Sequence, residues 1–286
     1  MFFHVKELQY RAKPAKPDPV YARKLQEVLG GQFGEMSVMM QYLFQGFNCR
    51  AEKKYRDMLL DIGTEEIGHV EMLCTMISQL LDGAPADQVD EAAKDPLLAA
   101  VMGGMNPQHA IVSGLGAAPT DSNGYPWNSK YIISSGHLLA DFRANLNAES
   151  QGLLQVVRLY EQTTDPGIRD MLSFMISRDI MHQNQWMAAI AEIEQMDGVI
   201  VPASFPRERT VEPATRQFLN FSEGEESAEG AWASGPLPDG TGNFEYVAKP
   251  QPMGEAPVLS VPADHQHSVP GTGPYVVNPG VEPLDK

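Results

Sequence analysis

One spacing of acidic residues and histidines occurs twice along this chain of 286 residues. In each half, an acid is followed about 30 residues later by a second acid, and a histidine stands three residues after that second acid. The members are Glu35, Glu66 and His69 in the first half, and Glu149, Asp179 and His182 in the second. Residues three apart lie on one face of an α-helix. The spacing therefore predicts two helical hairpins, each bringing its acids and its histidine together.

Apolar residues recur with a helical period along four stretches that match these hairpins. The stretches are 20–47, with Pro19 at its start, 52–80, 130–162 and 166–196. The breaks between paired stretches, near 48–51 and 163–167, fall midway between the acids. Each acid thus lies about 15 residues, or about 23 Å along its helix, from the turn. An antiparallel hairpin brings the acids level, and the sequence predicts an all-α core built as a four-helix bundle.

The second and third helices are joined by a long crossover connection. A shorter helix is expected over 86–102, and residues 103–128 are rich in Gly, Pro, Ser and Asn, which indicates irregular structure. The uncharged stretch 96–120 contains Gly103, Gly104, Pro107 and Pro119, which would break a membrane-spanning helix. We therefore expect a buried or covering connection rather than a membrane span.

The acids and histidines stand among apolar residues. Glu35 lies near Phe33, Met36 and Met39, and the apolar neighbours of His182 include Trp186. Burying carboxylates on such faces is costly unless their charge is compensated. A dinuclear metal centre compensates several carboxylates at once, and the paired hairpins match the arrangement described for ferritin-like di-iron and di-manganese bundles. The alternative is a bundle in which these side chains are buried and hydrogen-bonded without a metal.

Charge and cysteine content limit the partners. The net charge of −16 is opposite to what a general binder of nucleic acid or anionic membranes requires, so neither partner is expected. Two cysteines cannot form a disulfide framework, and the first residues lack the apolar run of a secretory signal. These features predict a cytoplasmic protein.

The amino-acid composition of the chain changes at residue 201. Thirteen of the 22 prolines lie between Pro202 and Pro283, and few apolar runs remain, so this segment cannot build an independent core. Its interspersed aromatic residues, among them Phe218, Trp232 and Tyr246, favour an arm over a flexible tail. The predicted organisation is a bundle over 1–200 and an extended, mostly irregular C-terminal arm over 201–286 that packs on the bundle and on neighbouring subunits. A homo-oligomer is expected, because such an arm needs a surface to lie on.

Several motifs are specific as a set. They are Gly34-Glu35-Met36, Gln41-Tyr42-Leu43-Phe44-Gln45-Gly46, Gly63-Thr64-Glu65-Glu66-Ile67-Gly68-His69, Asn106-Pro107-Gln108-His109-Ala110, Ala148-Glu149-Ser150-Gln151 and His182-Gln183. Through them the chain resembles the manganese catalases over most of its length. The resemblance implies disproportionation of hydrogen peroxide to water and dioxygen by two manganese ions per subunit, cycling between Mn(II)/Mn(II) and Mn(III)/Mn(III). It also implies a homohexamer, and it makes Glu35, Glu66, His69, Glu149 and His182 the manganese ligands.

Three further positions bear on the site. Asp179 is one methylene shorter than a glutamate, so we expect it to be an outer hydrogen-bonding or proton-transfer group rather than a sixth ligand. Tyr42 lies two turns from Glu35 on the same helix face and is expected to hydrogen-bond that carboxylate, the alternative being an ordinary buried tyrosine. Some members of the family carry an arginine where this chain has Ala148, so an outer cation is absent here.

The resemblance implies a second metal site, whose sequence pattern is less specific than that of the first. Some manganese catalases bind calcium where an arm meets a neighbouring subunit, and the matching positions are Asp57, Asp61, Asn220, Ser222 and Gly224. Carboxylate, amide and backbone oxygens are the ligands that calcium accepts. The alternative for the two aspartates is a solvated helix face.

Metal identity does not follow from the ligands. Two imidazoles and three carboxylates also suit iron, which binds such sites more tightly than manganese(II). A di-iron oxidase or peroxidase on the same bundle is therefore an alternative enzyme. A non-catalytic ferritin-like metal store or coat component is an alternative of a different class.

Overall fold

The computed structural model describes residues 3–83, 106–259 and 275–276. The chain divides into two compact units, Met1–Ser204 and Phe205–Lys286. The first unit is helical and contains all the residues expected to bind manganese.

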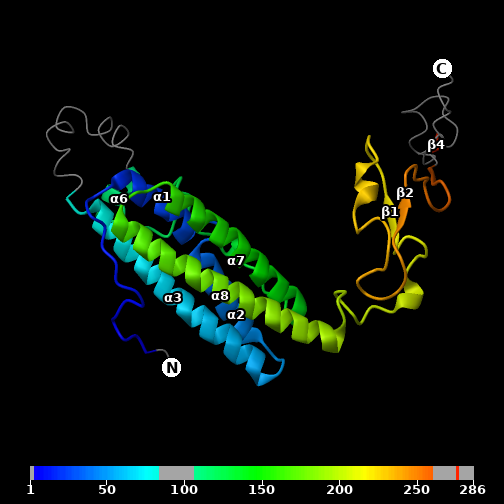
Figure 1. Cartoon of the computed structure of the whole chain (residues 1–286), viewed down its shortest axis with the longest axis horizontal. Coiled ribbons are helices and arrows are strands. Elements are labelled where there is room, and N and C mark those ends of the chain that lie inside the picture. The colour runs from blue at the N-terminus through cyan, green and yellow to red at the C-terminus, as the bar shows by residue number, and fades with distance from the viewer. Residues whose placement is uncertain (1–2, 84–105, 260–274, 277–286) are drawn as a thin grey trace, which may run out of the picture. The chain divides into compact units, whose positions relative to one another are not determined.

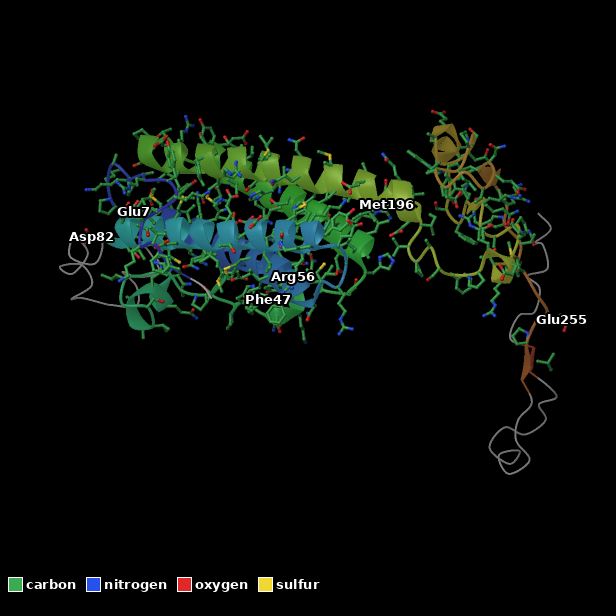
Figure 2. The ribbon with its side chains drawn as sticks, turned by 90° about the horizontal axis from the view of Figure 1, so that it is seen from below. Glu7, Phe47, Arg56, Asp82, Met196 and Glu255 are labelled. Atoms are coloured by element: carbon green, nitrogen blue, oxygen red, sulfur yellow. The ribbon has the colours of Figure 1, made fainter. Side chains whose placement is uncertain are left out.

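Four long helices of the first unit form the expected bundle. These four are α2 Glu35–Asn48, α3 Lys53–Leu81, α7 Leu138–Glu161 and α8 Pro166–Asp197. The unit also contains the shorter helices α1 Pro19–Gly30 and α6 Pro107–Ile111. Helices α2 and α3 pack as one hairpin, α7 and α8 as another, and the two hairpins lie side by side (Figure 1). Phe47 and Arg56, beside the α2–α3 turn, lie at the same end of the bundle as Met196, whereas Asp82 lies at the opposite end (Figure 2). The all-α core predicted from the helical period is confirmed.

Two of the helix starts follow from local sequence. The Asp18 carboxylate accepts a hydrogen bond from the Tyr21 amide ahead of α1, and Asp165 accepts from the amides of Gly167 and Ile168 ahead of α8. Each cap is followed by a proline at the first helical position, where its missing N–H costs nothing. The turn predicted at 163–167 is therefore confirmed.

The expectation of one continuous helix over 20–47 is wrong, because residues 31–34 separate α1 from α2. The apolar period continues through this break, but the backbone does not. A Cβ atom on Gly30 would lie 2.3 Å from the Thr120 carbonyl oxygen, so the crossover connection runs directly against the end of α1. The break makes Glu35 the first residue of α2.

The third long helix begins later than the expected residue 130. A short 3-10 turn spans Ser129–Tyr131, and α7 starts at Leu138 after Gly136, whose φ of +79° favours glycine. The Asp141 carboxylate accepts hydrogen bonds from the backbone amides of Ser135 and Gly136, which holds this turn against the first turn of α7.

The crossover connection is described from residue 106 onward. It contains α6, whose first turn is capped by the Asn106 side chain, and then a series of turns. The helix expected over 86–102 lies outside the described residues. Among the helices that the structure describes, none is long and apolar enough to cross a membrane.

The apolar core of the bundle consists of two clusters with a polar layer between them. Along α3, one cluster includes Leu59 and Ile62, and the other begins at Met72. Along α8, Met175 belongs to one cluster and Trp186 to the other. Glu66 and His69 on α3, and Asp179 and His182 on α8, lie between the residues of the two clusters. The polar layer is therefore enclosed by apolar packing above and below.

The second unit has little secondary structure. Strands β1 Gln217–Leu219 and β2 Glu245–Val247 pair in parallel, and β3 Val258–Leu259 pairs with β4 Tyr275–Val276 in antiparallel (Figure 1). The Phe218 and Tyr246 rings meet edge to face with their centroids 5.5 Å apart. Among the described residues of this unit, Ala233 alone is buried. For the residues of this segment that the structure describes, the prediction of a mostly irregular arm is confirmed.

We expect Gly30→Ala to lower the free energy of unfolding by about 1–3 kcal/mol, because the new methyl group meets backbone that cannot move aside. Gly68→Ala is the matched control, since its Cβ would meet only the flexible Gln9 side chain. Thermal unfolding followed by circular dichroism measures both. Equal melting temperatures for the two variants would contradict the close approach at Gly30.

Candidate metal centre

Five side chains that lie far apart in the sequence converge in the polar layer of the bundle. They are Glu35 at the start of α2, Glu66 and His69 on α3, Glu149 on α7, and His182 on α8, and all five are buried. Their ligand atoms form two groups whose members lie within 4.8 Å of one another. One group is Glu35, Glu66 and His69, and the other is Glu66, Glu149 and His182.

Glu66 belongs to both groups and faces a different histidine with each oxygen. Its Oε2 lies 2.6 Å from the Nδ1 atom of His69, and its Oε1 lies 3.0 Å from the Nδ1 atom of His182. The Nδ1 atom of His69 is also 3.4 Å from Glu35, and that of His182 is 3.5 Å from Glu149. The two imidazole rings lie 5.9 Å apart between centroids. The arrangement has the form of two neighbouring ion positions that share one carboxylate.

Several buried polar atoms of this cluster have no aligned hydrogen-bond partner. They include both carboxylate oxygens of Glu66, both ring nitrogens of His69 and the Nδ1 atom of His182. Such orphaned atoms are costly in a protein interior. A bound cation supplies the missing partner to carboxylate oxygens and to neutral imidazole nitrogens alike. The donor set therefore fits two metal ions better than it fits a hydrogen-bonded core without metal.

Without metal, protons compensate the charge of the cluster. Burial and the neighbouring Glu66 carboxylate raise the pKa of Glu35 to about 8. Burial lowers the pKa of His182, but the neighbouring carboxylates of Glu149, Glu65 and Glu66 outweigh it and raise that pKa to about 12. Divalent ions that bind here replace these protons, since the ligands must be deprotonated.

Asp179 lies on α8 in the same polar layer and belongs to neither ligand group. Burial raises the pKa of its carboxyl group well above the usual range, and the charges of Glu35, Glu149 and Glu66 raise it further. These two causes both favour the protonated form of the Asp179 carboxyl group. Ala148, on the adjacent helix, packs in the apolar cluster.

Tyr42 is fully buried, but the expected hydrogen bond to Glu35 is wrong. Its hydroxyl donates to Oε1 of Glu149 at 2.6 Å. Glu35 lies seven residues earlier on α2, about 10 Å along the axis, so the phenol reaches across to α7 instead. Tyr42 on α2 thus contacts a member of the group that Glu66, Glu149 and His182 form.

Glu65 was not expected in the site. Its carboxylate accepts hydrogen bonds from Arg178 on α8 and from Gln9 in the segment before α1. It also lies against the Nε2 atoms of both site histidines. The Glu65-Glu66 doublet was visible in the sequence, and a residue four positions before His69 faces it on a helix, but the long-range partners were not visible.

A network of buried amides joins α2 to α7 one turn before Glu149. Gln41 and Gln45 both donate to the Asn145 side chain, at 2.8 and 2.9 Å. The Gln41 side chain also accepts from the Ile133 amide, so the network holds the crossover connection as well. This network was not predicted, although the four-residue spacing of the two glutamines was a signal for it.

The residues expected to bind calcium occur as two separate sets. Asp57 and Asp61 lie one turn apart on α3, and Asp57 is paired with Lys53. Asn220, Ser222 and Gly224 form one turn of the second unit, in which the Asn220 side chain accepts from the Ser222 amide and donates to the Gly224 carbonyl. The two sets belong to different units of the chain.

Comparisons with known proteins agree with this geometry. Residues 1–282 match the family model for manganese-containing catalases. The chain is 67% identical over 261 residues (91% of the chain, 94% of the relative) to the uncharacterized protein YjqC of Bacillus subtilis strain 168. It is 57% identical over 272 residues (95% and 99%) to a manganese catalase from Bacillus subtilis. The crystal structure of wild-type KatB, a manganese catalase from Anabaena, matches with a TM-score of 0.67 at 28% identity, covering 87% of this chain and 100% of that one.

Replacing Glu66 should affect both ion positions, whereas replacing Glu35 should affect mainly one. We expect Glu66→Gln to weaken the binding of both ions at least about tenfold. Glu35→Gln should still retain the ion bound by Glu66, Glu149 and His182. Elemental analysis after dialysis against a chelator measures the ions retained per chain. A Glu66→Gln protein with undiminished metal content would show that the two groups are not one centre.

Proposed function

The chain belongs to the manganese catalases, ferritin-like enzymes that disproportionate hydrogen peroxide to water and dioxygen, and we propose that each subunit does so with two manganese ions. The ions are held by Glu35, Glu66, His69, Glu149 and His182. The observation that carries this assignment is the position of Glu66, whose two oxygens face two separate groups of ligands.

When bound, two manganese ions would give two electrons to one peroxide and take two from the next, by alternating between Mn(II)/Mn(II) and Mn(III)/Mn(III), so that neither half-reaction would have to release a radical. The protein supplies the surroundings. All five proposed ligands are buried between two apolar clusters, which exclude bulk water. Exclusion of water strengthens each charge interaction within the site.

Asp179 and Tyr42 are proposed to handle protons and hold the ligands. Asp179 is buried beside the ligand groups and belongs to neither of them, so its carboxyl group would be placed to give a proton to a departing oxygen and to recover one from peroxide. The Tyr42 hydroxyl donates a hydrogen bond to Glu149 and so fixes the orientation of that ligand. Neither residue needs to bind an ion.

Oxygen evolution and metal content together test this function. We expect the natively purified protein to contain manganese, to release one dioxygen for every two peroxide molecules consumed, and to lose this activity when the metal is removed. Manganese(II) should restore the activity, whereas iron(II) should not. An iron-loaded protein that oxidises other substrates would favour a di-iron oxidase or peroxidase. Metal uptake without oxygen evolution would favour a ferritin-like store or coat component.

We propose further that residues 201–286 form an arm that packs on the bundle 1–200 and on neighbouring subunits of a homohexamer. The second unit buries almost none of its own described side chains, and Phe221 and Trp232 are largely exposed, so it needs an outside surface. Calcium bound by Asp57, Asp61, Asn220, Ser222 and Gly224 would tie the arm to a subunit, since the ligands come from both units. The free thiols of Cys49 and Cys74 support a cytoplasmic location.

The arm is tested by Asp57→Asn with Asp61→Asn, compared with removal of the residues after Pro202. Both changes should abolish calcium binding, and both should shift sedimentation toward smaller species, the truncation more strongly because it also removes the apolar contacts. Manganese content should persist in the double variant, since its replacements lie outside the ligand groups. A hexamer that survives truncation would contradict the role of the arm in assembly.

A further inference from the structure

Glu65 sits on the side of both site histidines that faces away from the ligand groups. Its Oε2 lies 3.2 Å from the Nε2 atom of His182, within hydrogen-bond geometry. Its Oε1 lies 3.8 Å from the Nε2 atom of His69, which is too long for a hydrogen bond. The Nδ1 atoms of the same two rings face the carboxylates of the ligand groups. One carboxylate is therefore placed behind both imidazoles.

The Glu65 carboxylate is itself firmly held. Arg178 donates to both of its oxygens, at 2.6 Å from Nε and 3.1 Å from a terminal nitrogen. Gln9 donates to Oε1 at 2.8 Å from the segment that precedes α1. A bidentate guanidinium fixes the plane of a carboxylate as well as its position. Because α3, α8 and the N-terminal segment all contribute, Glu65 cannot turn away from the histidines without breaking several bonds.

A neutral imidazole carries one proton, and that proton decides which nitrogen can bind a metal. A carboxylate behind the ring accepts a hydrogen bond from the N–H group at Nε2, which keeps the proton there and leaves the lone pair of Nδ1 free. We propose that Glu65 is a positioning residue that fixes the Nε2–H form of His182, and more weakly of His69, and so presents both Nδ1 atoms to the manganese ions. The inference rests on the proposed ligand set.

Glutamine at position 65 would act against this arrangement. Its carbonyl oxygen would turn to the Arg178 guanidinium, which can only donate, and its NH2 group would then face the Nε2 atom of His182. That contact favours the opposite ring form, in which the proton is on Nδ1 and the ring cannot bind the ion. Since the contact to His182 is the short one, the ion held by Glu66, Glu149 and His182 should suffer more than the ion held by Glu35, Glu66 and His69.

The test compares manganese-loaded Glu65→Gln with the unmodified enzyme and with Glu71→Gln. Glu71 is a matched control, because it lies on the same helix and its carboxylate also contacts a histidine, His4, outside the site. We expect Glu65→Gln to bind manganese about 10–100-fold more weakly and to retain one ion instead of two after dialysis against a chelator. Its electron paramagnetic resonance spectrum should change from that of a coupled pair to that of an isolated Mn(II) ion. The control should keep two ions and the coupled spectrum.

The melting temperatures of the metal-free proteins separate positioning from a structural role. The inference is supported if the metal-free Glu65→Gln and Glu71→Gln proteins have the same melting temperature but only Glu65→Gln loses manganese. The inference is overturned if Glu65→Gln keeps both ions, or if it loses both equally together with its metal-free stability.

Should Glu65→Gln fail to fold, Arg178→Gln decides, because it loosens the carboxylate without removing it. Faster manganese loss than in the control supports the positioning role, and retention equal to the control overturns it. Failure of the proposed function would appear differently, as an unmodified enzyme that holds no manganese pair.

Discussion

The structure depends on one carboxylate held between two imidazoles in a dry interior. Glu66 is almost completely enclosed, and its two oxygens face His69 and His182 from opposite hairpins. A buried charge of this kind is stable only with compensation, so the bundle must either take up protons or bind cations. Every other feature of the site, from the flanking acids to the phenol of Tyr42, adjusts how that compensation is made.

The fold delivers this centre through interruptions as well as through regular helices. The break at 31–34 places Glu35 in the first turn of α2, where free backbone amides favour a negative charge. The centre divides the apolar core into two clusters, each formed by residues of more than one hairpin. Packing on either side thus keeps the hairpins in register while the polar layer between them is left free to bind ions.

The helices, and the convergence of the two acid-and-histidine sets in one layer, could be predicted because spacing and periodicity are local properties. The break before α2 was missed, because Phe33 continues the apolar period through residues 31–34 and was given more weight than the glycines at 30, 31 and 34. The partner of Tyr42 was assigned wrongly, since distance along one helix was considered and reach across the bundle was not. Glu65 stood next to a predicted ligand, but its meaning depends on Arg178 and Gln9, which no spacing rule connects to it.

The contact of Gln9 with Glu65 links the beginning of the chain to the interior of the enzyme. Gln9 precedes α1, and its neighbours Leu8 and Tyr10 pack against the apolar core of the bundle. Docking of the N-terminal segment and retention of the ions then strengthen one another, since two events that favour the same arrangement are reciprocally coupled.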